Sequence, residues 1–355
     1  GVPLRRIALR EAGHPIPDAR GERAAREALA LAAGARADEV LLVALSGGAS
    51  ALLSCPAPGL ELADLAATTG ELLRSGADIE ELNAVRKHLS RIGGGQLAQR
   101  ARCRRIFVLC VSDVLGDRLD VIGSGPCAPD PTTYRDALTV IERRGLRDRI
   151  PASVLRHLEE GLRGARDETP KPGDPRFDRV RSQVIANNRA ALRAAARAAA
   201  RRGLMAVTLS DAVRGEARVV GRRLAALARS LRGRSPVCLL AGGETTVTVR
   251  GPGRGGRNQE LALAAALELS ASRGVALLAA GTDGTDGPTD AAGAFADPGT
   301  VGRGAARGVD ARACLDRNDS YRFFEAEGGL LRSGPTRTNV MDLALVLVRP
   351  HGSAA

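Results

Sequence analysis

Short apolar runs typical of buried β-strands alternate along this chain with segments of helical periodicity. The predicted strands cover 39–45, 105–111, 182–186, 204–210, 236–242, 275–280 and 343–348, and the clearest predicted helices cover 62–75, 188–203 and 257–272. Strands separated by helices predict an α/β protein with largely parallel sheets, and near-continuous apolar strands predict burial on both faces. The run 245–250 alternates polar and apolar residues, which predicts a half-exposed strand that pairs with 236–242 as a hairpin.

The length and composition allow two folded domains. A chain of 355 residues can bury two hydrophobic cores. No apolar run approaches the roughly 18 residues that a membrane helix needs, and no secretory signal is visible, so we expect no membrane partner. The cysteines show no metal-binding spacing, which predicts reduced, packed thiols of a cytoplasmic protein at Cys55, Cys103, Cys110, Cys127, Cys238 and Cys314.

The chain is strongly basic, with a formal charge of +12 at pH 7. Nucleic acid is the first partner to consider for such a charge. However, the arginines are spread over Ala/Arg/Leu segments such as 190–203, and the chain has five phenylalanines, two tyrosines and no tryptophan. Because base-stacking side chains are scarce, we expect no nucleic-acid partner. An anionic small-molecule substrate fits the same charge.

Two loops that follow predicted strands are candidate phosphate-binding sites. The segment SGGAS (46–50) offers glycine N–H groups and two hydroxyls, although it can also be a plain strand-to-helix turn. The segment 112–133 combines Asp113 with a glycine–proline loop at Ser124 and Gly125. A carboxylate beside such a loop is typical of a magnesium–nucleotide site, and an N-cap aspartate with turn prolines is the alternative.

Arg86 and Lys87 lie side by side in a predicted helix within 75–90. Among 52 basic residues, Lys87 and Lys171 are the only lysines, so the compact ammonium at position 87 is a candidate ligand-binding group. The alternative is a solvated helix face.

The segment 241–260 contains Gly251, Gly253 and Gly256 in the pattern G-x-G-x-x-G, followed by a predicted helix. The preceding run alternates, and no acidic residue stands about 20 residues further on, so a dinucleotide site is not favoured. Arg257 at the start of the helix can instead clamp a phosphate or carboxylate.

The stretch GTDGTDGPTDAAGAFAD (281–297) places Asp283 and Asp286 directly after an apolar run. The spacing excludes an EF-hand. Carboxylates so close together are costly without a cation or a basic partner, so Mg²⁺ or a substrate hydroxyl that needs a base would explain them. A loop capped by aspartates is the alternative. Before the last strand, Asn339 and Asp342 are candidate ligand contacts or turn residues.

Several of these segments together resemble the glycerate 2-kinase family, the type II enzymes with DUF4147 and MOFRL domains. The similar segments are GHPIPD (13–18), LSGGASALL (45–53), SGADIEELNAVRKHLSRIGGGQLA (75–98), VSDVLGDRLDVIGSGPCAPDPTT (111–133), GGETTVTV (242–249), GRNQELAL (256–263), AAGTDGTDGPTDAAGA (279–294) and SGPTRTNVMDLALV (333–346). They occur in the family's order and cover nearly the whole chain.

The resemblance implies a Rossmann-like domain with a mainly parallel sheet at 1–231, truncated at its start, and a smaller α/β MOFRL domain at 232–355. It implies ATP- and Mg²⁺-dependent phosphorylation of D-glycerate, or a similar hydroxy acid, to 2-phosphoglycerate in the cleft between the domains, in a possible homodimer. Two alternatives stay open: an NAD(P)H-dependent hydroxypyruvate reductase, and an inactive nucleotide-binding remnant.

Within this reading, each candidate residue has an expected role. Catalysis is expected from Lys87, Arg257, Asp283 and Asp286, and metal binding from Asp113 and Asp283. Nucleotide or phosphate binding is expected from Ser46, Gly47, Gly48, Ser50, Ser124, Gly125, Gly243 and Glu244. Substrate binding is expected from Arg86, Asn258 and Asn339.

The chain departs from the family pattern in two places. Family members carry an upstream Gly-Lys-Ala motif whose lysine serves the active site, whereas this sequence begins near GHPIPD, which predicts an exposed sheet edge. The usual Lys-Gly-Gly-Arg-Leu-Ala reads Gly93-Gly94-Gly95-Gln96-Leu97-Ala98 here, so two expected positive charges are absent.

Overall fold

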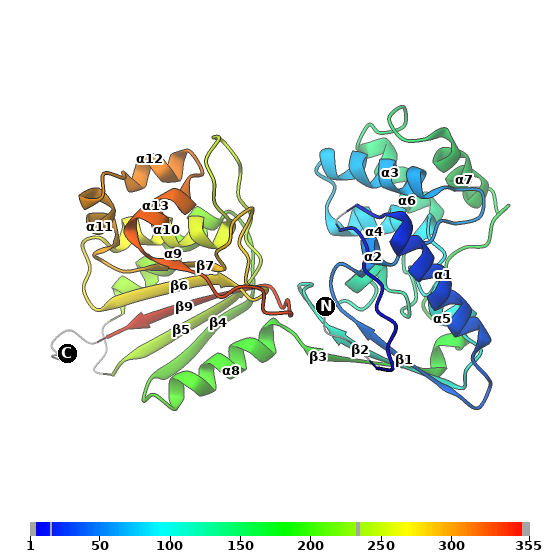
Figure 1. Cartoon of the computed structure of the whole chain (residues 1–355), viewed down its shortest axis with the longest axis horizontal. Coiled ribbons are helices and arrows are strands. Elements are labelled where there is room, and N and C mark those ends of the chain that lie inside the picture. Colours follow the sequence, from blue (N-terminus) through cyan, green and yellow to red (C-terminus); the bar gives the residue numbers. More distant parts are fainter. Residues whose placement is uncertain (1–4, 15, 232–234, 350–355) are drawn as a thin grey trace. The chain divides into compact units, whose positions relative to one another are not determined.

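The computed structural model describes residues 5–14, 16–231 and 235–349. The chain divides into two compact units (Figure 1), one of residues 1–110 and 117–185 and the other of residues 111–116 and 186–355. This division does not coincide with the predicted boundary between residues 231 and 232. The segment before 231 belongs to the second unit because its strand pairs with the strand that follows the predicted boundary.

The first unit contains a three-stranded sheet in the order β1 (Val40–Leu45), β2 (Arg105–Val111) and β3 (Val180–Ala186). Strands β1 and β2 are parallel, as the sequence predicts. The helices are α1 (Ala19–Gly34), α2 (Ala49–Leu52), α3 (Leu62–Arg74), α4 (Ile79–His88), α5 (Gln96–Arg100), α6 (Tyr134–Arg143) and α7 (Ala152–Leu162), with 3₁₀ turns η1 (Ile122–Ser124) and η2 (Pro175–Arg179).

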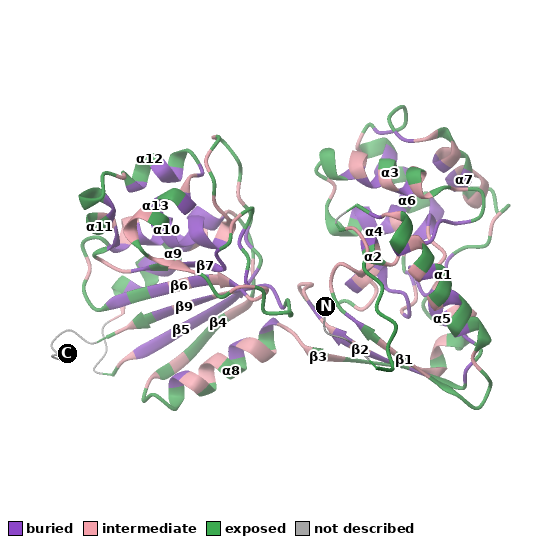
Figure 2. Ribbon diagram, in the orientation of Figure 1, coloured by how far each residue is buried: buried purple, intermediate pink, exposed green. Residues whose placement is uncertain are grey.

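Burial in this sheet is concentrated in the central strand β2, where buried residues alternate with more exposed ones, whereas β1 and β3 are mostly exposed or half-buried (Figure 2). In β2, Ile106 and Val108 are buried, whereas Phe107 is 38% exposed, and Leu42 in the edge strand β1 is 63% exposed. The predicted burial of both faces is therefore wrong for the described part of this sheet. A separate core lies among α3, α4, α6 and α7 and includes Leu72, Val85, Ile141 and Leu158.

The second unit contains a six-stranded sheet in the order β4-β5-β9-β6-β7-β8. The strands are β4 (Met205–Val213), β5 (Val237–Gly243), β6 (Val275–Gly281), β7 (Gly293–Ala296), β8 (Leu330–Leu331) and β9 (Asp342–Val348). The helices are α8 (Asn188–Ala200), α9 (Ala217–Ser230), α10 (Arg257–Leu269), α11 (Thr300–Ala306), α12 (Ala311–Asp316) and α13 (Ser320–Glu327).

The directions of these strands differ from the prediction of largely parallel sheets. Strands β4 and β5 are parallel, but β9 is antiparallel to both of its neighbours, β5 and β6, and β7 is antiparallel to β6 and β8. The difference arises because the last strand of the chain inserts between β5 and β6. An apolar strand buried on both faces has the same sequence pattern in either direction.

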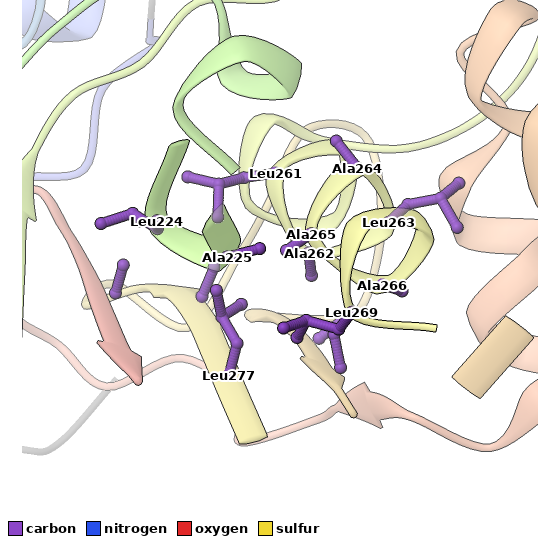
Figure 3. Close-up of a cluster of buried hydrophobic side chains, with 14 of the residues drawn as sticks. Leu224, Ala225, Leu261, Ala262, Leu263, Ala264, Ala265, Ala266, Leu269 and Leu277 are labelled. Atoms are coloured by element: carbon purple, nitrogen blue, oxygen red, sulfur yellow. The ribbon is translucent and has the colours of Figure 1, made fainter. Parts of the chain in front are cut away.

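Strand β5 is buried along its whole length because helices cover both faces of the sheet. On one face, Leu239 and Ala241 join the core formed with α9 and α10, part of which Figure 3 shows. On the other face, Cys238 and Leu240 pack against Leu192 of α8. Helix α10 supplies the run Leu261–Ala266 to the first core, all of it buried, so its N-terminus is held in a fixed position.

The predicted hairpin of 245–250 with 236–242 is wrong. Strand β5 pairs with β4 and β9, and residues 245–250 form no strand. Their one β-bridge joins Thr246 to Glu216, and the Thr246 carbonyl accepts a hydrogen bond from the N–H of Ala217 (2.8 Å). The alternation of this segment therefore reflects packing against the start of α9 rather than strand pairing.

The cysteines agree with the prediction, since all six are buried and none forms a disulfide. No helix in the described ranges combines the length and hydropathy needed to cross a membrane.

Candidate active site

In the first unit, Arg86 lines a small pocket whose mainly apolar wall also carries serine and threonine hydroxyls. Arg86 is half-buried near the end of α4 and lines this pocket together with Ser50, Ser90 and Ser124. No described residue makes a hydrogen bond or an ion pair with its guanidinium, and burial lowers the pKa of Arg86. A partly desolvated cation without a carboxylate partner is a ready site for an anionic ligand.

The hydroxyls in this pocket are ordered by a short chain of hydrogen bonds. Ser124 donates to the Oδ1 of Asn83 (2.7 Å), so the contact between the Ser50 and Ser124 hydroxyls (2.6 Å) has Ser50 as its donor. The amide of Asn83 in turn donates to the carbonyl of Val121 (3.3 Å). Ser124 has a left-handed backbone, with φ of 59°, an unusual conformation for a residue other than glycine. The two serines are thereby fixed beside Arg86.

The other candidate residues of the loops at 46–50 and 112–133 lie outside the Arg86 pocket. Ser46 is exposed, and Gly48, with φ of 80°, begins α2, which has only four residues and therefore a weak dipole. Gly47 lies in the same turn. The N–H of Gly125 donates to the carbonyl of Ile122 (2.9 Å), so it is not available to a phosphate. Of the SGGAS segment, Ser50 alone lines the Arg86 pocket.

Lys87, which follows Arg86 in the chain, has its ammonium buried between two carboxylates. Its side chain is 2% exposed, and Nζ lies 3.2 Å from Asp130 Oδ1 and 3.5 Å from Asp120 Oδ2. Asp130 is itself fully buried and also accepts from the N–H of Thr132 (3.0 Å) and the hydroxyl of Thr169 (2.9 Å). In this structure Lys87 therefore holds α4 to the neighbouring loops instead of facing a ligand.

The positions that depart from the family pattern lie beside these groups. Gly93 lines the Arg86 pocket, and a Cβ there would approach the carbonyl oxygen of Ser124 to 3.2 Å. The Gln96 amide donates to the carbonyl of Ser90 (2.5 Å). Gln96 therefore ties down the end of α4 without contributing charge to the pocket.

In the second unit, Arg257 at the start of α10 lies between two carboxylates. Its Nε and Nη2 bind Asp342 Oδ2 and Oδ1 (2.5 and 3.1 Å), and its Nη1 binds Glu244 Oε1 (2.8 Å). Burial lowers the pKa of Arg257, but the hydrogen bonds from its side chain to Asp342 and the charge of Glu244 raise it above its ordinary value. Burial raises the pKa of Glu244, Arg257 opposes that shift, and the charges of Asp342 and Asp113 add to it.

Asp286 caps the N-terminus of α10. Its Oδ1 accepts from the N–H and the side-chain amide of Asn258 (3.0 and 3.2 Å), and its Oδ2 accepts from the N–H of Gln259 (2.8 Å). Burial raises the pKa of Asp286 to about 6 despite these N–H donors. A Cβ on Gly256 would come within 2.2 Å of the Asp286 Cγ, so this position requires glycine. Asp286 and Asn258 are therefore occupied in orienting the helix that carries Arg257.

Asp283, in contrast, is partly exposed directly after β6. Its carboxylate accepts from the N–H and hydroxyl of Thr285 (both 2.9 Å), and within the described ranges it has no basic partner. It is thus the better placed of the two aspartates to contact a ligand.

The predicted magnesium site is not preformed as a cluster. The described residues contain no group of three or more His, Cys, Asp or Glu side chains that could hold a metal ion. Asp113 is close enough to Glu244 to raise its pKa, and Asp283 is accessible. Carboxylates of this kind fit Mg²⁺, which takes one or two protein oxygens and fills its other positions with phosphate and water.

The other two predicted residues of this unit, Gly243 and Asn339, serve strand pairing and a turn. Gly243 has φ of 147°, and a Cβ there would meet the carbonyl oxygen of Val213 at 2.3 Å, so it serves the β4–β5 pairing. Asn339 is exposed, and its Oδ1 accepts from the N–H of Met341 (3.0 Å) as in a turn. Its loop is fastened by Thr282, whose hydroxyl donates to the Met341 carbonyl (2.6 Å).

The glycine-rich loop 251–256 does not form a dinucleotide site. The N–H groups of Arg250 and Gly251 bind the Oδ1 of Asn318 (2.6 and 3.1 Å), and that of Gly253 binds the carbonyl of Arg317 (3.0 Å). A Cβ on Gly251 or Gly253 would meet that same carbonyl at 2.7 or 2.5 Å. The glycines thus allow close backbone packing, and these N–H groups are not free for a pyrophosphate.

Sequence reasoning named Glu244 and Asp342 as candidates but not as the partners of Arg257. The signal for Asp342 is a carboxylate at the first position of an otherwise apolar strand. Asn83, Asp120 and Asp130 carried no signal, because their partners are far away in sequence.

Comparisons with known proteins place these features in one family. Residues 1–159 match a domain of unknown function (DUF4147), and residues 237–342 match the MOFRL family. The glycerate 2-kinase of Pyrococcus horikoshii is 43% identical over 98% of this chain and 79% of its own length. A putative hydroxypyruvate reductase of Agrobacterium vitis is 42% identical over 98% of this chain and 78% of its own.

A solved structure agrees with this relationship. The crystal structure of the glycerate kinase of Thermotoga maritima has 42% identity and a TM-score of 0.87, and the match covers 98% of this chain and 82% of that one. The chain belongs to the glycerate 2-kinase family of phosphotransferases.

Proposed function

We propose that the chain transfers the γ-phosphoryl group of ATP to the 2-hydroxyl of D-glycerate, giving 2-phosphoglycerate and ADP. The observation that carries the proposal is the unpaired guanidinium of Arg86 in a hydroxyl-lined pocket. A guanidinium and ordered serine hydroxyls are the groups that bind a carboxylate or phosphate. The relatives named glycerate kinase support the choice of substrate.

In this mechanism the 2-hydroxyl oxygen attacks the γ-phosphorus while the bond from that phosphorus to the leaving ADP oxygen breaks. Asp283 takes the hydroxyl proton, since it is accessible and has no basic partner in the described structure. Arg257 stabilises negative charge that develops on the transferred group, and Asp342 and Glu244 hold its guanidinium in place.

Arg86 binds the glycerate carboxylate, with Ser50 and Ser124 completing that pocket. Asp113 would hold Mg²⁺, which would neutralise phosphate charge when bound, and this leaves Asp283 free to act as the base. Lys87 and Asp286 act through position only, because both are buried among fixed partners.

Steady-state kinetics with ATP, Mg²⁺ and D-glycerate test this assignment. The substitution Arg86→Met removes a charge-assisted hydrogen bond to the substrate, which contributes about 1.5–3 kcal/mol to binding. We therefore expect the KM for D-glycerate to rise roughly 10- to 150-fold. The KM for ATP should change little. Arg156→Met, which removes the same charge from an exposed position of α7, is the matched control and should leave both values unchanged. An unchanged KM for D-glycerate in Arg86→Met would refute the substrate assignment.

Two other functions predict different results in the same assay. A hydroxypyruvate reductase would consume NADPH with hydroxypyruvate in the absence of ATP, although the bonded N–H groups of the glycine loop disfavour it. An inactive remnant would bind nucleotide without turnover.

A further inference from the structure

A second, polar pocket in the first unit also lies at the end of α4. It is lined by the end of α4 and the residues that follow it, by α6 and α7, and by the loop at 165–169. The charged and aromatic residues of its wall are His88, Arg91, Arg100, Tyr134, His157, Arg166, Asp167 and Glu168. It is larger than the Arg86 pocket and shares only Ser90 with it. None of its other residues has a role in the mechanism above.

Two arginines in this pocket lack an acidic partner. The guanidinium of Arg91 has no hydrogen bond or ion pair to any described residue, and its Nε is buried. The hydrogen bonds of Arg100 go to neutral oxygens, namely the carbonyls of Arg91 (3.0 Å) and Gln96 (3.1 Å) and the Gln96 side chain (3.2 Å). Burial lowers the pKa of Arg100, and the nearby charge of Arg91 lowers it further. The guanidiniums of Arg91 and Arg100 thus repel each other at a partly buried position.

The acids around the pocket do not neutralise this pair. Glu168 is bound to His88 (2.8 Å) and to Lys171 (3.3 Å). Burial raises the pKa of Glu168, but the hydrogen bond from His88 and the N–H groups of Tyr134 and Thr169 bring it down to about 2.

Arg166 and Asp167, which also line the pocket, do not neutralise the charges of Arg91 and Arg100 either. Arg166 has its own acid, Glu160 (2.7 Å). Asp167 is exposed, and its carbonyl accepts from the Tyr134 hydroxyl (3.3 Å). The positive charges of Arg91 and Arg100 therefore remain uncompensated within the described structure.

The pocket wall also contains an unsatisfied acceptor. The Nε2 of His157 donates to the carbonyl of His88 (2.9 Å), which leaves Nδ1 as a lone-pair acceptor. That atom is buried without a partner in the described ranges, and burial lowers the pKa of His157, so the ring stays neutral. Because Nδ1 has no exposed surface, the two guanidiniums select the ligand, and they favour a doubly charged anion.

We propose that this pocket is a second anion site that binds a small phosphomonoester through Arg91 and Arg100. A phosphate dianion presents enough oxygens to pair with both guanidiniums, which a monocarboxylate does not. The site is independent of the Arg86 pocket and does not rest on the proposed reaction.

Calorimetric titration of the full chain tests the proposal, with glycerol 3-phosphate, inorganic phosphate, malonate and glycerol as probes. Glycerol 3-phosphate should bind measurably and more tightly than malonate, and glycerol should not bind. Arg91→Met and Arg100→Met should each weaken that binding at least tenfold. Arg156→Met and Arg86→Met are controls that should retain it, the second because Arg86 belongs to the other pocket.

The variants must keep their fold for this comparison, so circular dichroism of the ligand-free proteins accompanies it. Arg91→Lys and Arg100→Lys keep the charge and should lose part of the affinity, because an ammonium cannot bind two phosphate oxygens in the plane of a guanidinium. Binding that survives Arg91→Met and Arg100→Met, or disappears in Arg86→Met, would overturn the assignment, as would equal affinity for malonate or no binding of glycerol 3-phosphate.

Discussion

Replacing Lys87 by methionine should destabilise the protein rather than only reduce catalysis. The substitution keeps the length of the side chain but removes the charge that lies 3.2 Å from Asp130 and 3.5 Å from Asp120. Asp130 is fully buried, and removal of one partner from a buried ion pair costs about 3–5 kcal/mol. The hydrogen bonds from Thr132 and Thr169 to Asp130 persist, so we expect a loss near 3 kcal/mol.

Urea unfolding followed by circular dichroism measures this loss. Lys171→Met is the matched control, because the only other lysine is one-third exposed and its ion pair with Glu168 is worth at most about 1 kcal/mol. The double variant Lys87→Met/Asp130→Asn removes the uncompensated carboxylate and should recover part of the stability. If Lys87→Met unfolds within about 1 kcal/mol of the parent chain, the buried pair does not stabilise the fold and the structural role of Lys87 is wrong.

Three further predictions follow from the second unit. Because the pKa of Asp286 is raised from 3.8 to about 6, the free energy of unfolding should fall by about 3 kcal/mol as pH rises through the interval between these values, and Asp286→Asn should abolish that slope in urea titrations. Arg257→Lys cannot bind both oxygens of Asp342, so kcat for phosphoryl transfer should fall at least about tenfold while thermal unfolding shifts little. Gly256→Ala should cost more than about 2 kcal/mol of stability, whereas Gly302→Ala, in a helix with open space around it, should be neutral or slightly stabilising.

Local patterns in the sequence were sufficient for much of the fold. The predicted strand at 105–111 matches β2 at both ends, and the predicted helix at 188–203 contains α8. The short strands β7 and β8 were missed because two to four residues carry no periodicity. The position of β9 between β5 and β6 depends on long-range pairing, which strand composition does not encode.

The candidate site was predictable by residue type but not by role. Asp283 and Asp286 have the same glycine-rich context in sequence, yet one is accessible and the other caps α10. The difference depends on Gly256, whose missing side chain leaves room for the Asp286 carboxylate. Likewise, Arg86 and Lys87 are neighbours in sequence, but Lys87 meets acids 33 and 43 residues away.

The measurement that tests the proposed reaction most directly is phosphorus NMR of the products formed from D-glycerate, ATP and Mg²⁺. We expect a resonance of 2-phosphoglycerate that grows in step with ADP, and the loss of this resonance in an Asp283→Asn variant that keeps its fold. A product phosphorylated at the 3-hydroxyl, or ADP formation that does not depend on D-glycerate, would contradict it.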